Sequence, residues 1–193
     1  MKKPAIGILL SAALPGAGEI YAGSWLKGAV LIGVEVALWV GYVHFSDKGQ
    51  EWEDIFHTYA NTHWSEDQWR TWMNNHPEFT DTTHTLPDTK TQQYYEMIGK
   101  YDQFKGGWDD YIEGGEALTE NRDHYEGLRH ESNTQFKRAS YCTMLALGNR
   151  LLSVFDTAFT IRRLNRQVEA RMRMVMKRTG RDTVPALALQ VGW

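Results

Sequence analysis

Hydrophobic positions are concentrated at the two ends of this chain, and the strongest apolar run covers residues 26–45. A run of about 20 residues is long enough for a helix that crosses roughly 30 Å of hydrocarbon. Trp25 and Lys27 near its start and Tyr42 near its end are residue types typical of a membrane interface. We therefore predict a membrane-spanning helix over residues 26–45.

An earlier apolar run, residues 5–14, is too short to cross a bilayer alone. The stretch PGAGEIYAG follows it, and its proline and glycines interrupt a helix. We predict a broken or re-entrant segment whose irregular backbone is buried in protein. Because MKK precedes the run, a cleaved signal peptide is the alternative, although no small-x-small pair follows the run directly.

The middle of the chain, residues 46–137, is polar and carries aromatic side chains at helical intervals. The spacing predicts one helix over residues 52–59 and another over 94–108, separated by a turn-rich loop at 74–91. We expect a small helical insert whose aromatic rings pack against each other or at a membrane surface. A carbohydrate- or peptide-binding platform is the alternative.

A long helix is predicted from an N-cap at Thr119 to about Gln167, since no proline interrupts this part of the chain. Its apolar part, residues 139–161, is a second candidate for crossing a membrane. Arg150 and Asp156 would each cost roughly 2.5 to 3.5 kcal/mol there, whereas each Leu, Ile, Val or Phe returns only about 0.3 to 0.6 kcal/mol. The crossing therefore needs buried partners, and an amphipathic helix of a soluble bundle is the alternative.

Ionisable residues within the predicted membrane segments indicate which segments pack together. A carboxylate in the middle of a span, such as Glu35, faces a partner inside the bundle by default. We predict that Arg150 pairs with Glu35 or Glu19, and that Asn149 or Asp156 contacts the glycine-rich bend. We thus expect an intramembrane polar cluster of Glu35, Asn149, Arg150 and Asp156, with structural pairing favoured over catalysis.

Charge is distributed unevenly along the chain. Residues 46–137 carry 19 acidic and 8 basic side chains, whereas residues 162–181 carry 8 basic side chains and one acid. The positive-inside rule places this basic segment in the cytoplasm, next to anionic lipid, and the acidic insert in the periplasm, where it can meet a protein partner. Nucleic acid is the weaker alternative partner for the basic segment, and we expect none. The closing residues 184–193 are expected to form a short strand or a docked tail.

Motifs for catalysis or metal binding are weak. The single cysteine, Cys142, lies in an apolar stretch, and the histidine spacings fit no helical metal pair. Four acidic residues at 109–116 lack the ligand pattern of a calcium loop, so we interpret them as a solvated face. We predict no catalytic residue, no metal and no cofactor.

The bend carries a pattern of eight residues in fixed spacing, P-G-x-G-[QE]-x-Y-x-G-x-x-x-K-G. It consists of Pro15, Gly16, Gly18, Glu19, Tyr21, Gly23, Lys27 and Gly28. This pattern resembles the N-terminal motif of an uncharacterised family of bacterial membrane proteins, which is in turn similar to small two-helix transmembrane domains with a glycine-rich turn. Glu19 stands where the family pattern has glutamine. The resemblance implies a membrane-embedded bacterial protein of unknown function and supplies no catalytic residues.

We therefore expect an all-α integral membrane protein with a broken or re-entrant N-terminal segment, two further membrane helices and an acidic helical insert. The expected division is a membrane hairpin at 1–45, the insert at 46–137, a membrane helix and its extension at 138–168, and a basic tail at 169–193. The leading hypothesis is a non-enzymatic cell-envelope scaffold or assembly partner in the inner membrane. The alternative is a small transporter, channel component or intramembrane enzyme that uses Glu35, Arg150 and Asp156.

Overall fold

The computed structural model describes residues 1–79 and 84–177 of the chain. Within these residues the protein is mostly helical and has no strand, apart from one isolated bridge between Trp64 and Trp108, so the predicted all-α fold is confirmed. Its helices, in chain order, are α1 (Pro4–Ala13), α2 (Ala17–Ala22), α3 (Trp25–His63), α4 (Glu66–Asn75), η1 (Pro77–Phe79), α5 (Gln92–Lys100), η2 (Asp102–Gly107) and α6 (Glu120–Lys177).

The chain divides into two compact units. The first, which we call the hairpin unit, combines Met1–Gly41 with the chain from Cys142 onward. The second, the aromatic unit, is Tyr42–Tyr141. The predicted tail at 184–193 lies outside the described residues.

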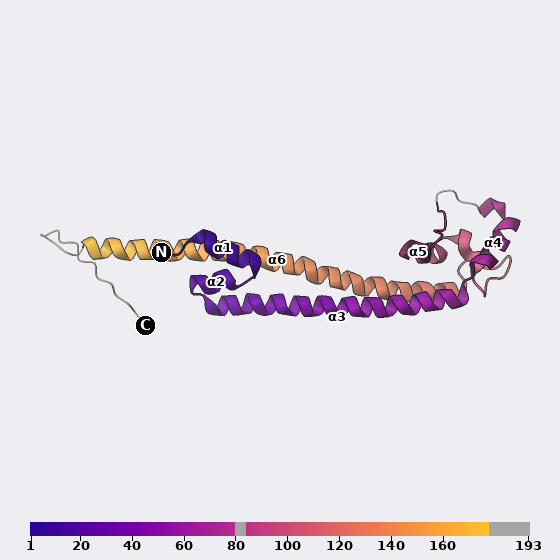
Figure 1. Cartoon of the computed structure of the whole chain (residues 1–193), viewed down its shortest axis with the longest axis horizontal. Helices are drawn as coiled ribbons and strands as arrows, with labels where there is room; N and C mark the ends of the chain where they lie inside the picture. The colour runs from indigo at the N-terminus through magenta and orange to yellow at the C-terminus, as the bar shows by residue number, and fades with distance from the viewer. Residues whose placement is uncertain (80–83, 178–193) are drawn as a thin grey trace. The chain divides into compact units, whose positions relative to one another are not determined.

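Helices α1 and α2 form a hairpin that returns to its own beginning (Figure 1). The chain turns at Gly16, whose φ of +93° is a left-handed conformation that favours glycine. The end of α2 then lies beside the start of α1, where the Lys3 backbone N–H donates to the Tyr21 hydroxyl at 3.2 Å. The broken N-terminal segment expected from the sequence is therefore present as two short helices.

Helix α3 runs without a break through both the apolar run and the first predicted helix of the insert. Gly49 lies within this helix and packs directly against α6. A Cβ atom at this position would lie 2.8 Å from the ring of Phe136, so the contact needs a glycine. The Ser132 hydroxyl also donates to the Gly49 carbonyl oxygen at 2.9 Å. Two helices were expected here, and the structure has one continuous helix, which packs closely against α6 at Gly49.

The second predicted helix of the insert is shorter than expected. Helix α5 ends at Lys100, and a 3-10 helix, η2, replaces its last two turns. In η2, Gly106 and Gly107 lie directly against the indole rings of Trp72 and Trp64, respectively. A Cβ atom on either glycine would lie 2.3 Å from the indole that it faces. A regular helix with larger side chains could not make this approach.

Helix α6 begins at the predicted cap, since the Arg122 backbone N–H donates to the Thr119 hydroxyl at 3.3 Å. It extends ten residues beyond the expected end at Gln167, to Lys177. Among the residues described, only α3 is both long and apolar enough to cross a membrane; α1 is apolar but short. The second crossing predicted for α6 does not stand out on length and composition alone.

Aromatic side chains form the core of the aromatic unit, as expected. Trp108, Phe104, Ile98 and Tyr125 are completely buried there, among other aromatic rings. Their polar atoms are satisfied: Trp108 Nε1 donates to the Ile98 carbonyl at 3.0 Å, and the Tyr125 hydroxyl donates to the Tyr95 carbonyl at 2.6 Å. These rings fill space, so the platform alternative loses its main support.

Candidate functional site

One face of α6 in the hairpin unit is buried, and its middle is polar. The buried positions recur every three or four residues, as on one side of a helix. They are Ala146, Asn149, Ser153, Thr157 and Ile161. The sequence pattern predicts only part of this stripe, because Thr157 is a weak polar signal in an apolar context.

The first polar group on this stripe surrounds Glu19, which is completely buried. The Ser153 hydroxyl donates to Glu19 Oε2 at 2.9 Å and the Ser11 hydroxyl donates to the same oxygen at 3.3 Å. Ser11 is also 2.8 Å from the Thr157 hydroxyl, and Ser153 accepts from the Gly16 backbone N–H at 2.9 Å. The glycine-rich bend is thus attached to α6 by hydroxyl groups, which form what we call the hydroxyl cluster.

The second polar group surrounds Glu35, and it contains the expected contact with Arg150. Arg150 donates to Glu35 Oε1 from Nε at 3.1 Å and from Nη2 at 3.0 Å. Trp39 Nε1 donates to the same oxygen at 3.1 Å, and Asn149 Nδ2 donates to Oε2 at 3.1 Å. Both carboxylate oxygens are therefore occupied, and Asn149 also donates to the Leu31 carbonyl oxygen at 3.1 Å.

Asp156 was expected in this same cluster, but the structure places it elsewhere. Its carboxylate pairs with Lys27 at 2.9 Å, and the two side chains are 38% and 58% exposed. Asp156 directly precedes Thr157 of the buried stripe, so its side chain lies beside the stripe and not on it. There it contacts Lys27 near the start of α3. The polar cluster of the structure is Glu35, Asn149 and Arg150.

The glycines of the bend motif allow close approach between helices. A Cβ atom on Gly18 would lie 2.1 Å from Ser11 Oγ and 2.4 Å from the Gly7 carbonyl oxygen. A Cβ atom on Gly16 would lie 2.2 Å from the Gly28 carbonyl oxygen. The other motif members have different roles: Gly23 ends α2 in a left-handed conformation, with φ of +96°, the Tyr21 hydroxyl accepts from Lys3, and Lys27 pairs with Asp156. Pro15 is completely buried at the turn.

Burial in the hairpin unit is the reverse of that in a water-soluble core. Between residues 25 and 41 only Gly28 and Glu35 are buried. The large apolar side chains point outward instead. On α6 these are Met144, Leu145, Leu147, Leu151, Leu152, Phe155 and Phe159, each at least 60% exposed. An exposed apolar surface of this extent marks a region that contacts a partner or lipid.

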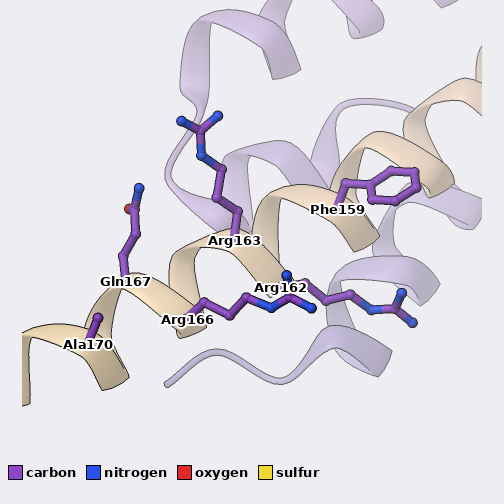
Figure 2. A pocket seen from close by; sticks show the side chains of 6 residues that line it. All are labelled: Phe159, Arg162, Arg163, Arg166, Gln167 and Ala170. Carbon is purple, nitrogen blue, oxygen red and sulfur yellow. The ribbon is translucent and has the colours of Figure 1, made fainter. Parts of the chain in front are cut away.

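Basic residues at the start of the chain and on α6 lie at one end of this apolar surface. Asn165 joins them: its Oδ1 accepts from the Lys2 backbone N–H at 3.0 Å, and its Nδ2 donates to the Lys2 carbonyl at 2.9 Å. Figure 2 shows Arg162 and Arg166 extending to one side of α6, and Arg163 with Gln167 to the other, close to Phe159. We call Lys2, Lys3, Arg162, Arg163 and Arg166 the basic collar.

Three of the four acidic residues at 109–116 are exposed to solvent, as predicted for a solvated face, and only Asp110 is partly buried. Three of the four also make specific contacts. Asp109 pairs with His63 at 2.9 Å, and Asp110 accepts from the Asn121 backbone N–H at 2.8 Å, at the start of α6. Glu113 accepts from Trp72 Nε1 at 2.9 Å, whereas Glu116 is exposed. These contacts fasten the loop before α6 to the helices around it.

Sequence reasoning missed Arg122, whose side chain is only 4% exposed. It donates to the carbonyl oxygens of Gly99 and Ala117, at 2.7 and 2.8 Å, and to Asp102 at 2.8 Å. Its position in the first turn of α6 gave no signal, because charged residues there are usually exposed.

No protein-family model, curated protein or solved structure matches this chain. In the described part of the chain, no three His, Cys, Asp or Glu side chains are grouped so as to hold a metal ion. The site must therefore be interpreted from its own geometry, which is a buried polar stripe inside an apolar exterior.

Proposed function

We propose that this chain is a non-enzymatic membrane protein of the bacterial cell envelope, in which the hairpin unit is embedded in lipid and the aromatic unit serves as a scaffold or assembly module. The reversed burial of the hairpin unit is the observation that carries this proposal. Hydrocarbon accepts Leu, Val and Phe on the outside, whereas Ser, Thr, Asn and Glu must find partners inside the bundle. The described residues of the hairpin unit follow this pattern, with one buried atom, Glu19 Oε1, left without a hydrogen-bond partner.

The hairpin of α1 and α2 supports a re-entrant arrangement. Its two ends lie together at Lys3 and Tyr21, so the chain enters and leaves at the same level before α3 begins. Helix α3 then crosses, and α6 returns beside the polar groups that make its own crossing tolerable. The Glu35 contact with Arg150 and Asn149 offsets the cost that an isolated α6 would incur.

The basic collar supports an orientation with this end in the cytoplasm, by the positive-inside rule. Among the described residues, no carboxylate pairs with Arg162, Arg163 or Arg166. With no ion-pair partner among the described residues, these guanidinium groups are suited to bind the phosphates of anionic lipid, and Phe159, whose ring is exposed, lines the same pocket. The acidic aromatic unit is then periplasmic, where we expect its protein partner.

A scaffold is favoured over a transporter or an intramembrane enzyme by the state of Glu35. Its oxygens accept four hydrogen bonds, so none is oriented toward an open cavity. Asp156, the third residue of the alternative, lies apart and is paired with Lys27.

Membrane residence is tested by a matched pair of substitutions. Leu152→Lys places a charge on the outward face of α6, and Ile112→Lys places one at a position of the aromatic unit that is 76% exposed. We expect Leu152→Lys to cost about 3 kcal/mol of insertion and to reduce the protein retained in membranes after alkaline carbonate extraction. Ile112→Lys should leave retention unchanged. Recovery of the wild-type chain in the soluble fraction would contradict the proposal.

A further inference from the structure

Glu19 differs from the other acidic groups of the hairpin unit that contact neighbouring helices. Glu35 has Arg150 and Asp156 has Lys27, each at 3.0 Å or less. Within the described residues no Lys, Arg or His side chain pairs with Glu19, although Glu19 is completely buried. A buried carboxylate without a neutralising partner is strongly disfavoured, because the charge loses its hydration and gains no opposite charge in return.

The two oxygens of Glu19 are also unequal. Oε2 accepts from the Ser153 and Ser11 hydroxyls, whereas Oε1 is buried and has no hydrogen-bond partner. Buried polar atoms are nearly always satisfied, so an unpaired buried carboxylate oxygen beside three hydroxyl groups calls for an explanation. The donors already present are neutral hydroxyls, and they cannot cancel the charge.

We propose that Glu19 and the hydroxyl cluster of Ser11, Ser153 and Thr157 bind one small monovalent cation, either a proton or a sodium ion. The shared chemistry is neutralisation of the Glu19 carboxylate at Oε1. Hydroxyl groups suit both sources, because each can donate to a carboxylate, accept from a carboxylic acid or offer a lone pair to a metal ion.

The other charged groups around this site leave it isolated. Helix α1 brings Ser11, and α6 brings Ser153 and Thr157, none of which is charged. The ionisable residues one turn or less from Ser153 and Thr157 on α6 are already paired, Asp156 with Lys27 and Arg150 with Glu35. The inference rests on the proposed function in one respect: if the hairpin unit is in lipid, no water surrounds the bundle.

Infrared spectroscopy of the full chain in lipid vesicles at pH 7 tests this site, since a carboxylic acid and a carboxylate absorb separately. The wild-type minus Glu19→Gln difference spectrum assigns the Glu19 band, and Glu169→Gln, at an exposed position, is the matched control. For a proton we expect an acid band that is lost in Glu19→Gln, retained in Glu169→Gln and unchanged when sodium chloride replaces choline chloride. For sodium we expect the Glu19 band to change with that replacement.

A Glu19 carboxylate band at pH 7 that is the same in sodium and choline overturns the proposal. If Glu19→Gln fails to fold, Ser153→Ala replaces it, because loss of the hydroxyl donor to Oε2 shifts the frequency of the Glu19 band and so assigns it. A chain that is retained in membranes but shows this insensitive carboxylate loses the cation site alone. A chain found in the soluble fraction contradicts the proposed function instead.

Discussion

At the scale of single residues, the pair of Glu35 and Arg150 shows how one contact makes helices α3 and α6 interdependent. Glu35 is 5% exposed and Arg150 is 38% exposed, so the arginine lies at the rim and the carboxylate inside. Removing one member leaves an uncompensated charge, whereas replacing both with neutral groups of similar volume can be neutral or stabilising.

We therefore expect Arg150→Met alone to lower the melting temperature of the detergent-solubilised chain, at a cost of about 3 kcal/mol. The double variant Glu35→Gln with Arg150→Met should regain most of this loss, since no buried charge remains. A double-mutant cycle from circular dichroism melts measures the recovery. Additive losses would contradict a direct interaction. A scaffold should keep its cellular role in a double variant that folds, whereas a transport or catalytic role would be lost.

His57 predicts how the stability of the aromatic unit depends on pH. Burial lowers the pKa of His57 below its usual 6.5, against a smaller raising effect of Glu53 and Asp54. Its ring stacks on Tyr95 at 3.9 Å, and its buried Nε2 lies 3.9 Å from Glu53, too far for a hydrogen bond. The folded state thus prefers the neutral imidazole.

Because the folded pKa is the lower one, the contribution of His57 is complete above pH 6.5 and is lost as the pH falls through the folded value. Denaturant melts followed by tryptophan fluorescence at pH 7.5 and 5.5 should show a smaller loss at low pH in His57→Gln than in wild type. His130→Gln, at an exposed position, should behave like wild type. An equal pH dependence in His57→Gln would exclude this origin.

At the scale of elements, the contact between the α1–α2 hairpin and α6 depends on the absence of side chains. The Gly18 backbone lies against a hydroxyl of α1, a carbonyl of α1 and a hydroxyl of α6. By contrast, Gly33 of α3 has nothing within 4 Å of its Cβ position. The same substitution at these two glycines therefore has opposite consequences.

We expect Gly18→Ala to destabilise the hairpin unit by about 1 to 3 kcal/mol, because the backbone carbonyl of Gly7 cannot move aside cheaply. Gly33→Ala should leave stability unchanged or raise it by up to about 1 kcal/mol, since alanine favours a helix. Melting temperatures in the same detergent decide between them. Equal effects of the two changes would show that the hairpin does not pack as described.

The sequence predicted the elements whose signals are local. Apolar length indicated the first part of α3, Pro15 and Gly16 indicated the bend, and Thr119 indicated the start of α6. It failed where a distant contact decides the outcome. Gly49 packs against Phe136 within a continuous α3. After α5 ends, Gly106 and Gly107 pack against two indole rings.

The candidate site was predictable to a similar degree. The pairing of Arg150 with Glu35 followed from charge, because two costly groups in lipid must meet. The burial of Glu19 without a cation did not follow, since it depends on which face of α2 turns toward α6. Asp156 was assigned to the cluster because its spacing from Asn149 allows a shared face, and a single helical step places it outside.

At the scale of the whole molecule, the two units follow different solvent rules. The aromatic unit buries rings and satisfies them with backbone carbonyls, as a water-soluble domain does. The hairpin unit buries hydroxyls, an amide and two carboxylates, and exposes its aliphatic side chains. Under the proposed function, the hairpin unit is in lipid and the aromatic unit is in water.

Cysteine labelling tests the orientation of the chain. The sole cysteine, Cys142, is replaced by alanine, and Glu116→Cys and Glu169→Cys are made separately at exposed positions. An impermeant maleimide added to intact spheroplasts should label Glu116→Cys at once, and Glu169→Cys only after permeabilisation. Equal labelling of both from outside would exclude the proposed topology.

The buried polar stripe of α6 also determines which mutations the chain can accumulate. In a library of all single substitutions, Leu147 and Leu152 should exchange freely with other aliphatic residues but reject charges that a watery surface accepts. Ser153 and Thr157 should accept small polar or small apolar residues and reject bulky ones. Under the proposed function, a map of the tolerated substitutions would therefore show which residues face lipid, without any structural measurement.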